Sequence, residues 1–141
     1  MEFNWFILSI ISAFVFTFTT LLGRLVMDKG VSSTLVTFYI FLFATIFLGG
    51  YVFIVEKSFA TTTTVLAILV FAGIFSFIGH ALFYKAISNA PNPGYVDAVS
   101  SLRIIMVTVI AIYLFNLKPS SIGIIGSILI VIGAILISMV S

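Results

Sequence analysis

Residues 64–87 read TVLAILVFAGIFSFIGHALFYKAI, an apolar run interrupted by one histidine and one lysine. A helix needs about 20 mostly apolar residues to cross roughly 30 Å of hydrocarbon, and this run is long enough. Its apolar residues are continuous rather than alternating, which favours a helix over a strand of a membrane barrel. The stretch therefore predicts a transmembrane helix.

Four similar apolar runs flank this one, and short polar segments separate them. The 116–118 segment is so short that the last two spans must form a tight antiparallel hairpin. Ser32, Ser33 and Thr34 are suitable N-caps for the second span, and Pro119 suits the first turn of the fifth. The sequence predicts an all-α membrane protein with one domain over residues 1–141 and five transmembrane helices, at about 5–26, 34–55, 64–87, 95–115 and 119–139.

The composition excludes most other classes of protein. Of 141 residues, 62% are hydrophobic and 7% are charged, whereas soluble domains carry roughly 25% charge. The chain has no cysteine, one histidine and four acidic residues, so thiolate metal sites, disulfide scaffolds and hydrolytic chemistry have little support. No catalytic motif is present, and we expect no enzyme activity, no cofactor and no metal. A net charge of +2 gives no support to nucleic-acid binding, and the lipid bilayer is the expected partner.

Five spans place the two termini on opposite sides of the membrane. Lys57 and Lys118 then share one side, and the other side holds Arg24, Lys29, Lys85 and Arg103. Positive-inside reasoning puts the C-terminus in the cytoplasm. The difference is small enough to permit insertion in both orientations.

The third span carries polar residues along one helix face. Ser76, His80 and Tyr84 recur at every fourth position, and Lys85 lies about 100° round the helix from Tyr84. One interpretation is the wall of a water-filled cavity. The other is a helix–helix contact, in which the hydroxyls bond across the interface and His80 is a satisfied neutral ring.

The fourth span carries Asp97, Ser100 and Arg103, with Arg103 near its midpoint. A charged arginine at that depth costs on the order of 3 kcal/mol, so it should face the protein interior. It could attract an anionic group of a substrate, or it could be a structural charge that snorkels or pairs with Asp97. If the span starts later, Arg103 is an ordinary interfacial residue. The predicted substrate pathway comprises Ser76, His80, Tyr84, Lys85, Asp97, Ser100 and Arg103.

The fifth span contains small residues that permit close approach of another helix. The contact is either a dimer seam or packing against the fourth span within the chain. These residues are Gly123, Gly126, Ser127, Gly133 and Ala134.

Several of these segments resemble one family. Residues 125–133, IGSILIVIG, are similar to the closing helix of the EamA domain of the drug/metabolite transporter superfamily. Residues 79–87, GHALFYKAI, resemble its G-x-x-L-x-Y/F-x-A-I/L stretch, and a break at 91–94 and a serine-rich segment at 99–102 follow as in the family. Arg103-Ile104 stands where the family often has proline, which argues against a kinked fourth helix. Leu117 stands where it often has glutamate, which favours a subgroup with a single repeat.

The resemblance implies a half-transporter, because full-length relatives contain two five-helix repeats of opposite topology. It predicts a homodimer, antiparallel by this argument, or a heterodimer with a similar five-helix protein. Such a pair would move a small metabolite or drug-like solute without ATP hydrolysis, and His80 and Asp97 are candidates for proton coupling. A non-transporting subunit of a larger membrane protein is the alternative. A small multidrug-resistance-type exporter would need a deep carboxylate in the first span, and Glu2 is too close to the end.

Overall fold

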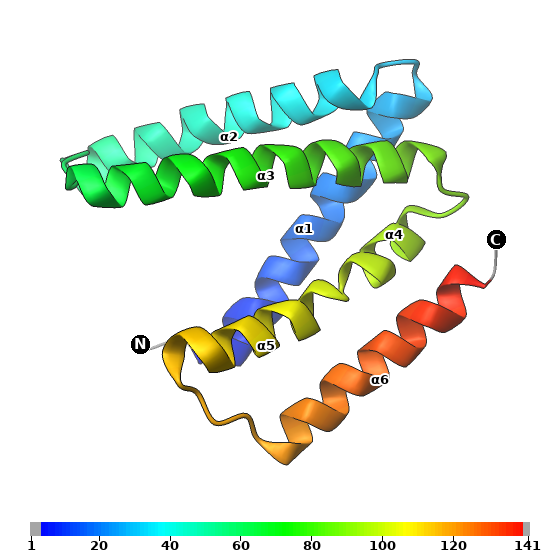
Figure 1. Ribbon diagram of the computed structural model, residues 1–141. Helices are drawn as coiled ribbons and strands as arrows, with labels where there is room; N and C mark the ends of the chain where they lie inside the picture. Colours follow the sequence, from blue (N-terminus) through cyan, green and yellow to red (C-terminus); the bar gives the residue numbers. More distant parts are fainter. Residues whose placement is uncertain (1–3, 140–141) are drawn as a thin grey trace. The chain divides into compact units, whose positions relative to one another are not determined.

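The computed structural model describes residues 4–139, and every regular element in this part is a helix (Figure 1). Five segments are long and apolar enough to cross a membrane, with Pro93–Phe115 counted as one span. This confirms the predicted all-α architecture with five spans. Glu2 lies outside the described residues. The helices are α1 (Trp5–Asp28), α2 (Ser33–Val55), α3 (Thr63–Asn89), α4 (Pro93–Ser100), α5 (Arg103–Phe115) and α6 (Ser121–Ser138).

Side-chain caps fix where several helices begin. The Ser32 side chain accepts a hydrogen bond from the Leu35 backbone N–H at 3.3 Å, so the first of the three predicted caps starts α2. Ser120 accepts from the Gly123 N–H at 3.1 Å and starts α6. The predicted place of Pro119 in the first turn of this helix is therefore wrong, because the serine cap puts Pro119 before the helix.

The fourth span is broken between α4 and α5, although it has no proline at this point. Leu102 N–H bonds to the Val99 carbonyl at 3.1 Å, and Ile104 N–H bonds to the Ser101 carbonyl at 2.9 Å. Both bonds reach back three residues rather than four, which is the pattern of a 3₁₀ turn. The Ser101 hydroxyl also donates to the Ala98 carbonyl, and such back-bonding bends helices. The missing proline was thus a poor argument against a kink.

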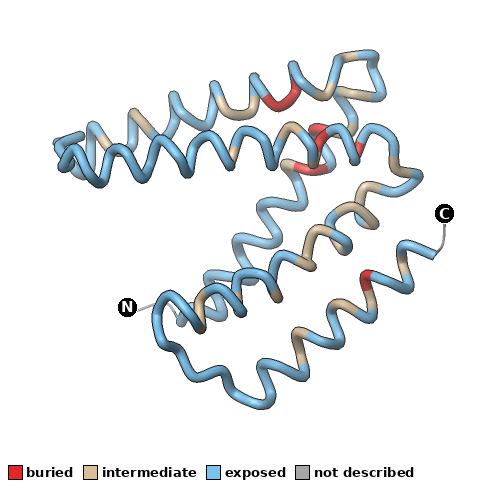
Figure 2. Tube along the Cα trace, viewed as in Figure 1, coloured by how far each residue is buried: buried red, intermediate tan, exposed pale blue. Residues whose placement is uncertain are grey.

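The chain divides into two compact units at the end of α3. In the first unit, α2 and α3 run side by side (Figure 1), and the rings of Phe41 and His80 meet edge to face at a centroid distance of 4.9 Å. Its buried side chains gather where α1, α2 and α3 meet (Figure 2). They include Thr20, Val36, Thr37, Tyr84 and Ile87.

The second unit is organised by the packing of α6 on α4 and, to a smaller extent, on α5. Ala134 on α6 is 3% exposed, while Gly126, Ser127 and Gly133 are half-buried. Gly123 is exposed, and its carbonyl accepts a hydrogen bond from the Ser127 hydroxyl at 2.9 Å. Small side chains therefore line the more buried face of α6, and the structure places that helix against α4. Their role as a dimer seam stays a prediction.

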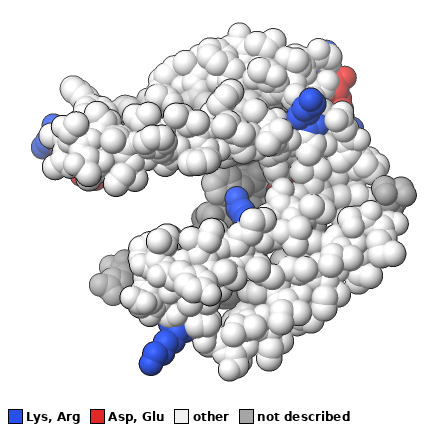
Figure 3. Space-filling model, in the orientation of Figure 1, with Lys and Arg blue, Asp and Glu red and all other residues white. Residues whose placement is uncertain are grey.

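Most of the apolar surface of the spans is exposed within the chain. No more than 11% of the most apolar window of any span is buried. Most of the visible surface is uncharged, and the Lys, Arg, Asp and Glu side chains form a few small, separate patches on it (Figure 3). Such a surface would be unfavourable in water, and it suits a hydrocarbon environment.

Candidate functional site

Tyr84, the end of the predicted polar stripe, lies in a helix contact. It is 2% exposed, and its hydroxyl donates to the Thr19 carbonyl of α1 at 3.4 Å. Gly23 of α1 makes room for the ring, because a Cβ there would lie 2.5 Å from Tyr84 Cε1. These contacts are those of the helix-packing interpretation of the stripe at this position.

Arg24 joins α1 to the C-terminal end of α3. Its Nε donates to the Asp28 carboxylate at 2.8 Å, and its Nη1 donates to the Ile87 carbonyl. Ile87 is in the last turn of α3, where carbonyls lack helical partners and the helix dipole is negative. The guanidinium therefore stabilises a helix end and an ion pair together. Arg24 was counted among the charges that set the orientation, and its i, i+4 spacing to Asp28 is a local signal for this ion pair.

His80 is exposed on α3, one turn before Tyr84. Its Nδ1 lies 2.9 Å from the Ser76 carbonyl and 3.5 Å from the Ser76 hydroxyl. The Phe41 ring of α2 meets the imidazole at an interplanar angle of 89°. The structure thus brings Ser76 and His80 together, and it adds an aromatic neighbour that the sequence did not indicate.

Lys85 is exposed near the end of α3. Its backbone carbonyl accepts a hydrogen bond from the Ser88 hydroxyl at 2.8 Å. The lysine is on the turn that follows His80, about five residues and roughly 7.5 Å along the helix axis.

The polar residues of the fourth span lie beside the helix break in the second unit. Asp97 is exposed and Ser100 is half-buried, both on α4, and Arg103 is exposed as the first residue of α5. Asp97 and Arg103 lie on opposite sides of the break, and pairing between them stays one of the interpretations of this charge. The break also changes the angular spacing between Asp97 and Arg103 from that of a continuous helix.

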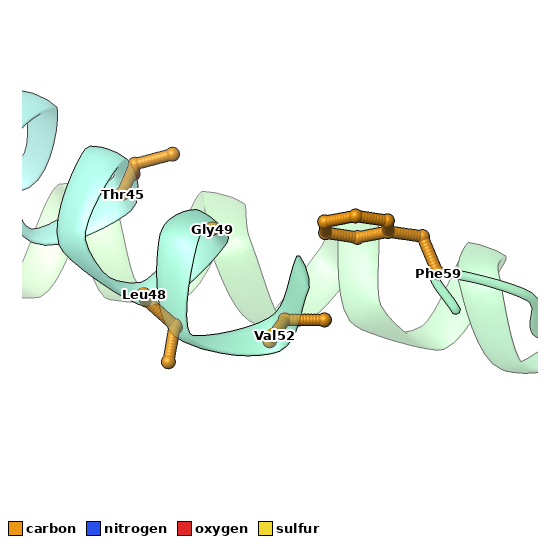
Figure 4. Close-up of a pocket in the computed structure, with 5 residues that line it drawn as sticks. All are labelled: Thr45, Leu48, Gly49, Val52 and Phe59. Atoms are coloured by element: carbon orange, nitrogen blue, oxygen red, sulfur yellow. The ribbon is translucent and has the colours of Figure 1, made fainter. Parts of the chain in front are cut away.

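An apolar groove runs along the second half of α2 and has a volume of about 300 Å³ (Figure 4). Gly49 leaves open space along it, and the Phe59 ring from the following loop lies at one end. Only Thr45 contributes a polar side chain to the lining, which offers little to a polar solute. The lining residues are Thr45, Leu48, Gly49, Val52 and Phe59.

The polar residues form one set in each unit, with Ser76 and His80 in the first and Asp97, Ser100 and Arg103 in the second. Among the residues that the structure describes, no group of three His, Cys, Asp or Glu side chains is placed to hold a metal ion. The arrangement offers hydrogen bonding and charge at membrane depth. Each residue's place in a substrate pathway stays a prediction.

The comparison with family models gives a match over almost the whole chain. The model of the EamA-like transporter family matches residues 3–139, which include every helix described above. No curated protein and no solved structure matches the chain. Because the match covers far more than half of the sequence, this multi-pass membrane protein belongs to the EamA-like transporter family.

Proposed function

We propose that this chain is one half of a secondary transporter, which moves a small metabolite or drug-like solute as a dimer by alternating access. The observation that carries the proposal is the family match, which spans residues 3–139 and so corresponds to one five-helix repeat. In a tandem chain, a repeat with an odd number of spans makes the second repeat inverted, and two separate copies related by an axis in the membrane plane reproduce that arrangement. Such inverted pairs are a common basis for alternating access around a site near the membrane midplane.

The exposure of polar groups at membrane depth supports a pairing of copies. Arg103 lies near the middle of the Pro93–Phe115 span and is exposed in its own chain. An arginine that faces lipid at that depth is costly, so water, a solute or a second copy is expected to meet it. In a homodimer, or in a heterodimer with a similar five-helix protein, the second chain would cover Arg103 and complete the lining of the proposed substrate pathway.

In this mechanism Arg103 and Lys85 provide positive potential and His80 provides hydrogen bonding. Asp97 and His80 are the groups through which a proton could be coupled to transport. Tyr84 has a different role in the proposal, because its hydroxyl already donates to Thr19 and its ring packs on Gly23. It holds α1 and α3 together beside the pathway.

Flux measurements in proteoliposomes test the proposal. Proteoliposomes that contain this chain alone are given a panel of labelled metabolites and drug-like solutes from outside, under a pH gradient. We expect uptake by the wild type that Arg103→Ala and His80→Ala both reduce, while the loop variant Lys118→Ala behaves as wild type. Unchanged flux in Arg103→Ala and His80→Ala would remove these residues from the mechanism.

The alternative is a subunit that transports nothing and stabilises a larger membrane protein. It predicts no flux from the chain alone for any member of the panel. It also predicts stoichiometric co-purification with a larger membrane protein from native membranes. The family match favours transport, since the family is one of transporters.

A further inference from the structure

The imidazole of His80 is held in one orientation by two neighbours. On one side, Nδ1 lies 2.9 Å from the Ser76 carbonyl oxygen, one turn back along α3. On the other side, the Phe41 ring of α2 packs against it edge to face. A side chain fixed at both sides presents its remaining atoms in a defined direction, as a binding group must.

This geometry determines which ring nitrogen carries the hydrogen. A backbone carbonyl only accepts hydrogen bonds, so Nδ1 must donate. In the neutral imidazole one nitrogen donates and the other accepts, and Nε2 is therefore the acceptor. The residue is exposed, so this acceptor is open to groups outside the chain.

A neutral acceptor inside a membrane span needs a donor, because hydrocarbon supplies none. We propose that Nε2 of His80 accepts a hydrogen bond from an O–H or N–H group of the transported solute. This inference rests on the proposed transport function. It narrows the proposed function, because it assigns His80 to solute recognition and leaves Asp97 as the candidate for proton coupling.

The single histidine of the chain makes the test direct. The full chain, with its histidine nitrogens isotopically labelled, is reconstituted in lipid nanodiscs, and nuclear magnetic resonance reads the protonation of each ring nitrogen. We expect a hydrogen on Nδ1 and a bare Nε2 at neutral pH. Ser76→Ala is the matched control and should leave this unchanged, because it keeps the backbone carbonyl.

Phenol and anisole then serve as probes, since they have similar shape and only phenol carries an O–H. We expect phenol to shift the Nε2 resonance in a saturable manner and anisole to leave it in place. A ring with its hydrogen on Nε2, a doubly protonated ring, or a phenol shift that never saturates would overturn the inference without any flux measurement. These outcomes are independent of whether the chain transports a given solute.

Two substitutions of His80 distinguish the roles of Nδ1 and Nε2 in the flux assay. The glutamine amide reaches the region of Nε2, whereas the asparagine amide reaches only that of Nδ1. For a solute with an O–H or N–H group that the wild type carries, we expect His80→Asn to lower flux roughly tenfold and His80→Gln to stay within about threefold, which is the scale of one hydrogen bond. Equal flux in both variants and the wild type would refute the role of Nε2 while the transport proposal stands. Absence of wild-type flux would count against the transport proposal, and so against solute recognition at Nε2, even with the expected tautomer.

Discussion

The contact between Gly23 and Tyr84 gives the sharpest prediction for stability. In Gly23→Ala, the new methyl group would lie 2.5 Å from Tyr84 Cε1 and 3.3 Å from Cδ1 and Cζ. Real Cβ contacts are essentially never as short as the first distance, so the ring or α1 must move. The ring is rigid and 2% exposed, and its hydroxyl is bonded to the Thr19 carbonyl.

Two effects of opposite sign decide the magnitude. Overpacking of a well-filled site costs about 1–3 kcal/mol. Alanine is favoured over glycine in a helix interior by up to about 1 kcal/mol. We therefore expect Gly23→Ala to lower the free energy of unfolding by up to about 2 kcal/mol, and by about 1–3 kcal/mol relative to a helical glycine whose added Cβ has open space.

Equilibrium unfolding in bicelles measures this change against two matched controls. Gly49→Ala and Gly73→Ala also replace a helical glycine, but nothing lies within 4 Å of their added Cβ. They should be neutral or slightly stabilising. When Gly23→Ala is introduced into the Tyr84→Leu variant, it should cost much less than in the wild type, because the smaller leucine side chain leaves space for the new methyl group. The reasoning is refuted if Gly23→Ala is as stable as Gly49→Ala.

Three further predictions use the same unfolding assay or a distance measurement. Arg24→Gln should lower the free energy of unfolding by about 1–2 kcal/mol, because the Ile87 carbonyl loses a charged donor. Asp28→Asn should lower it by less than about 1 kcal/mol, because Asp28 belongs to an exposed ion pair. Equal losses in the two variants would contradict the contact with the carbonyl. Lys57 has a φ of 57°, a left-handed conformation that glycine adopts at no steric cost. Lys57→Gly should therefore raise the free energy of unfolding by up to about 1 kcal/mol. A clear decrease would show that the turn is not left-handed. Ser101→Ala removes the hydrogen bond from the serine hydroxyl to the Ala98 carbonyl, so the span should straighten. The distance between spin labels at Val96 and Val109 should then increase. An unchanged distance would assign the bend to the backbone alone.

The five spans were predictable because each depends on local hydropathy. The apolar composition of residues 64–87 is by itself enough to predict a membrane span. The cap at Ser32 is also local, because its partner is the Leu35 N–H three residues later. The break at Ser101 was not predicted, although its signal is local. The serine hydroxyl can compete for a helix carbonyl, but Ser9 and Ser127 do so within the continuous helices α1 and α6.

The contacts of the candidate site depend on long-range packing, and the sequence therefore revealed less of them. Tyr84 bonds to Thr19 and Arg24 bonds to Ile87, each across more than 60 residues. The helical spacing of Ser76, His80 and Tyr84 placed them on one face, but it could not tell a wet wall from a packed one. The structure buries Tyr84 and leaves His80 exposed, so one stripe serves two purposes.

The orientation of copies in the membrane tests the central claim most directly. The chain has no cysteine, so Lys57→Cys, in the loop between α2 and α3, introduces a unique label site. Sealed vesicles with the reconstituted variant are exposed to a membrane-impermeant maleimide and then to a permeant one. Antiparallel pairs predict that about half of the copies react with the first reagent and the rest with the second, and that dimers isolated from the vesicles carry one label of each kind. Dimers that carry two labels of the same kind would contradict the account.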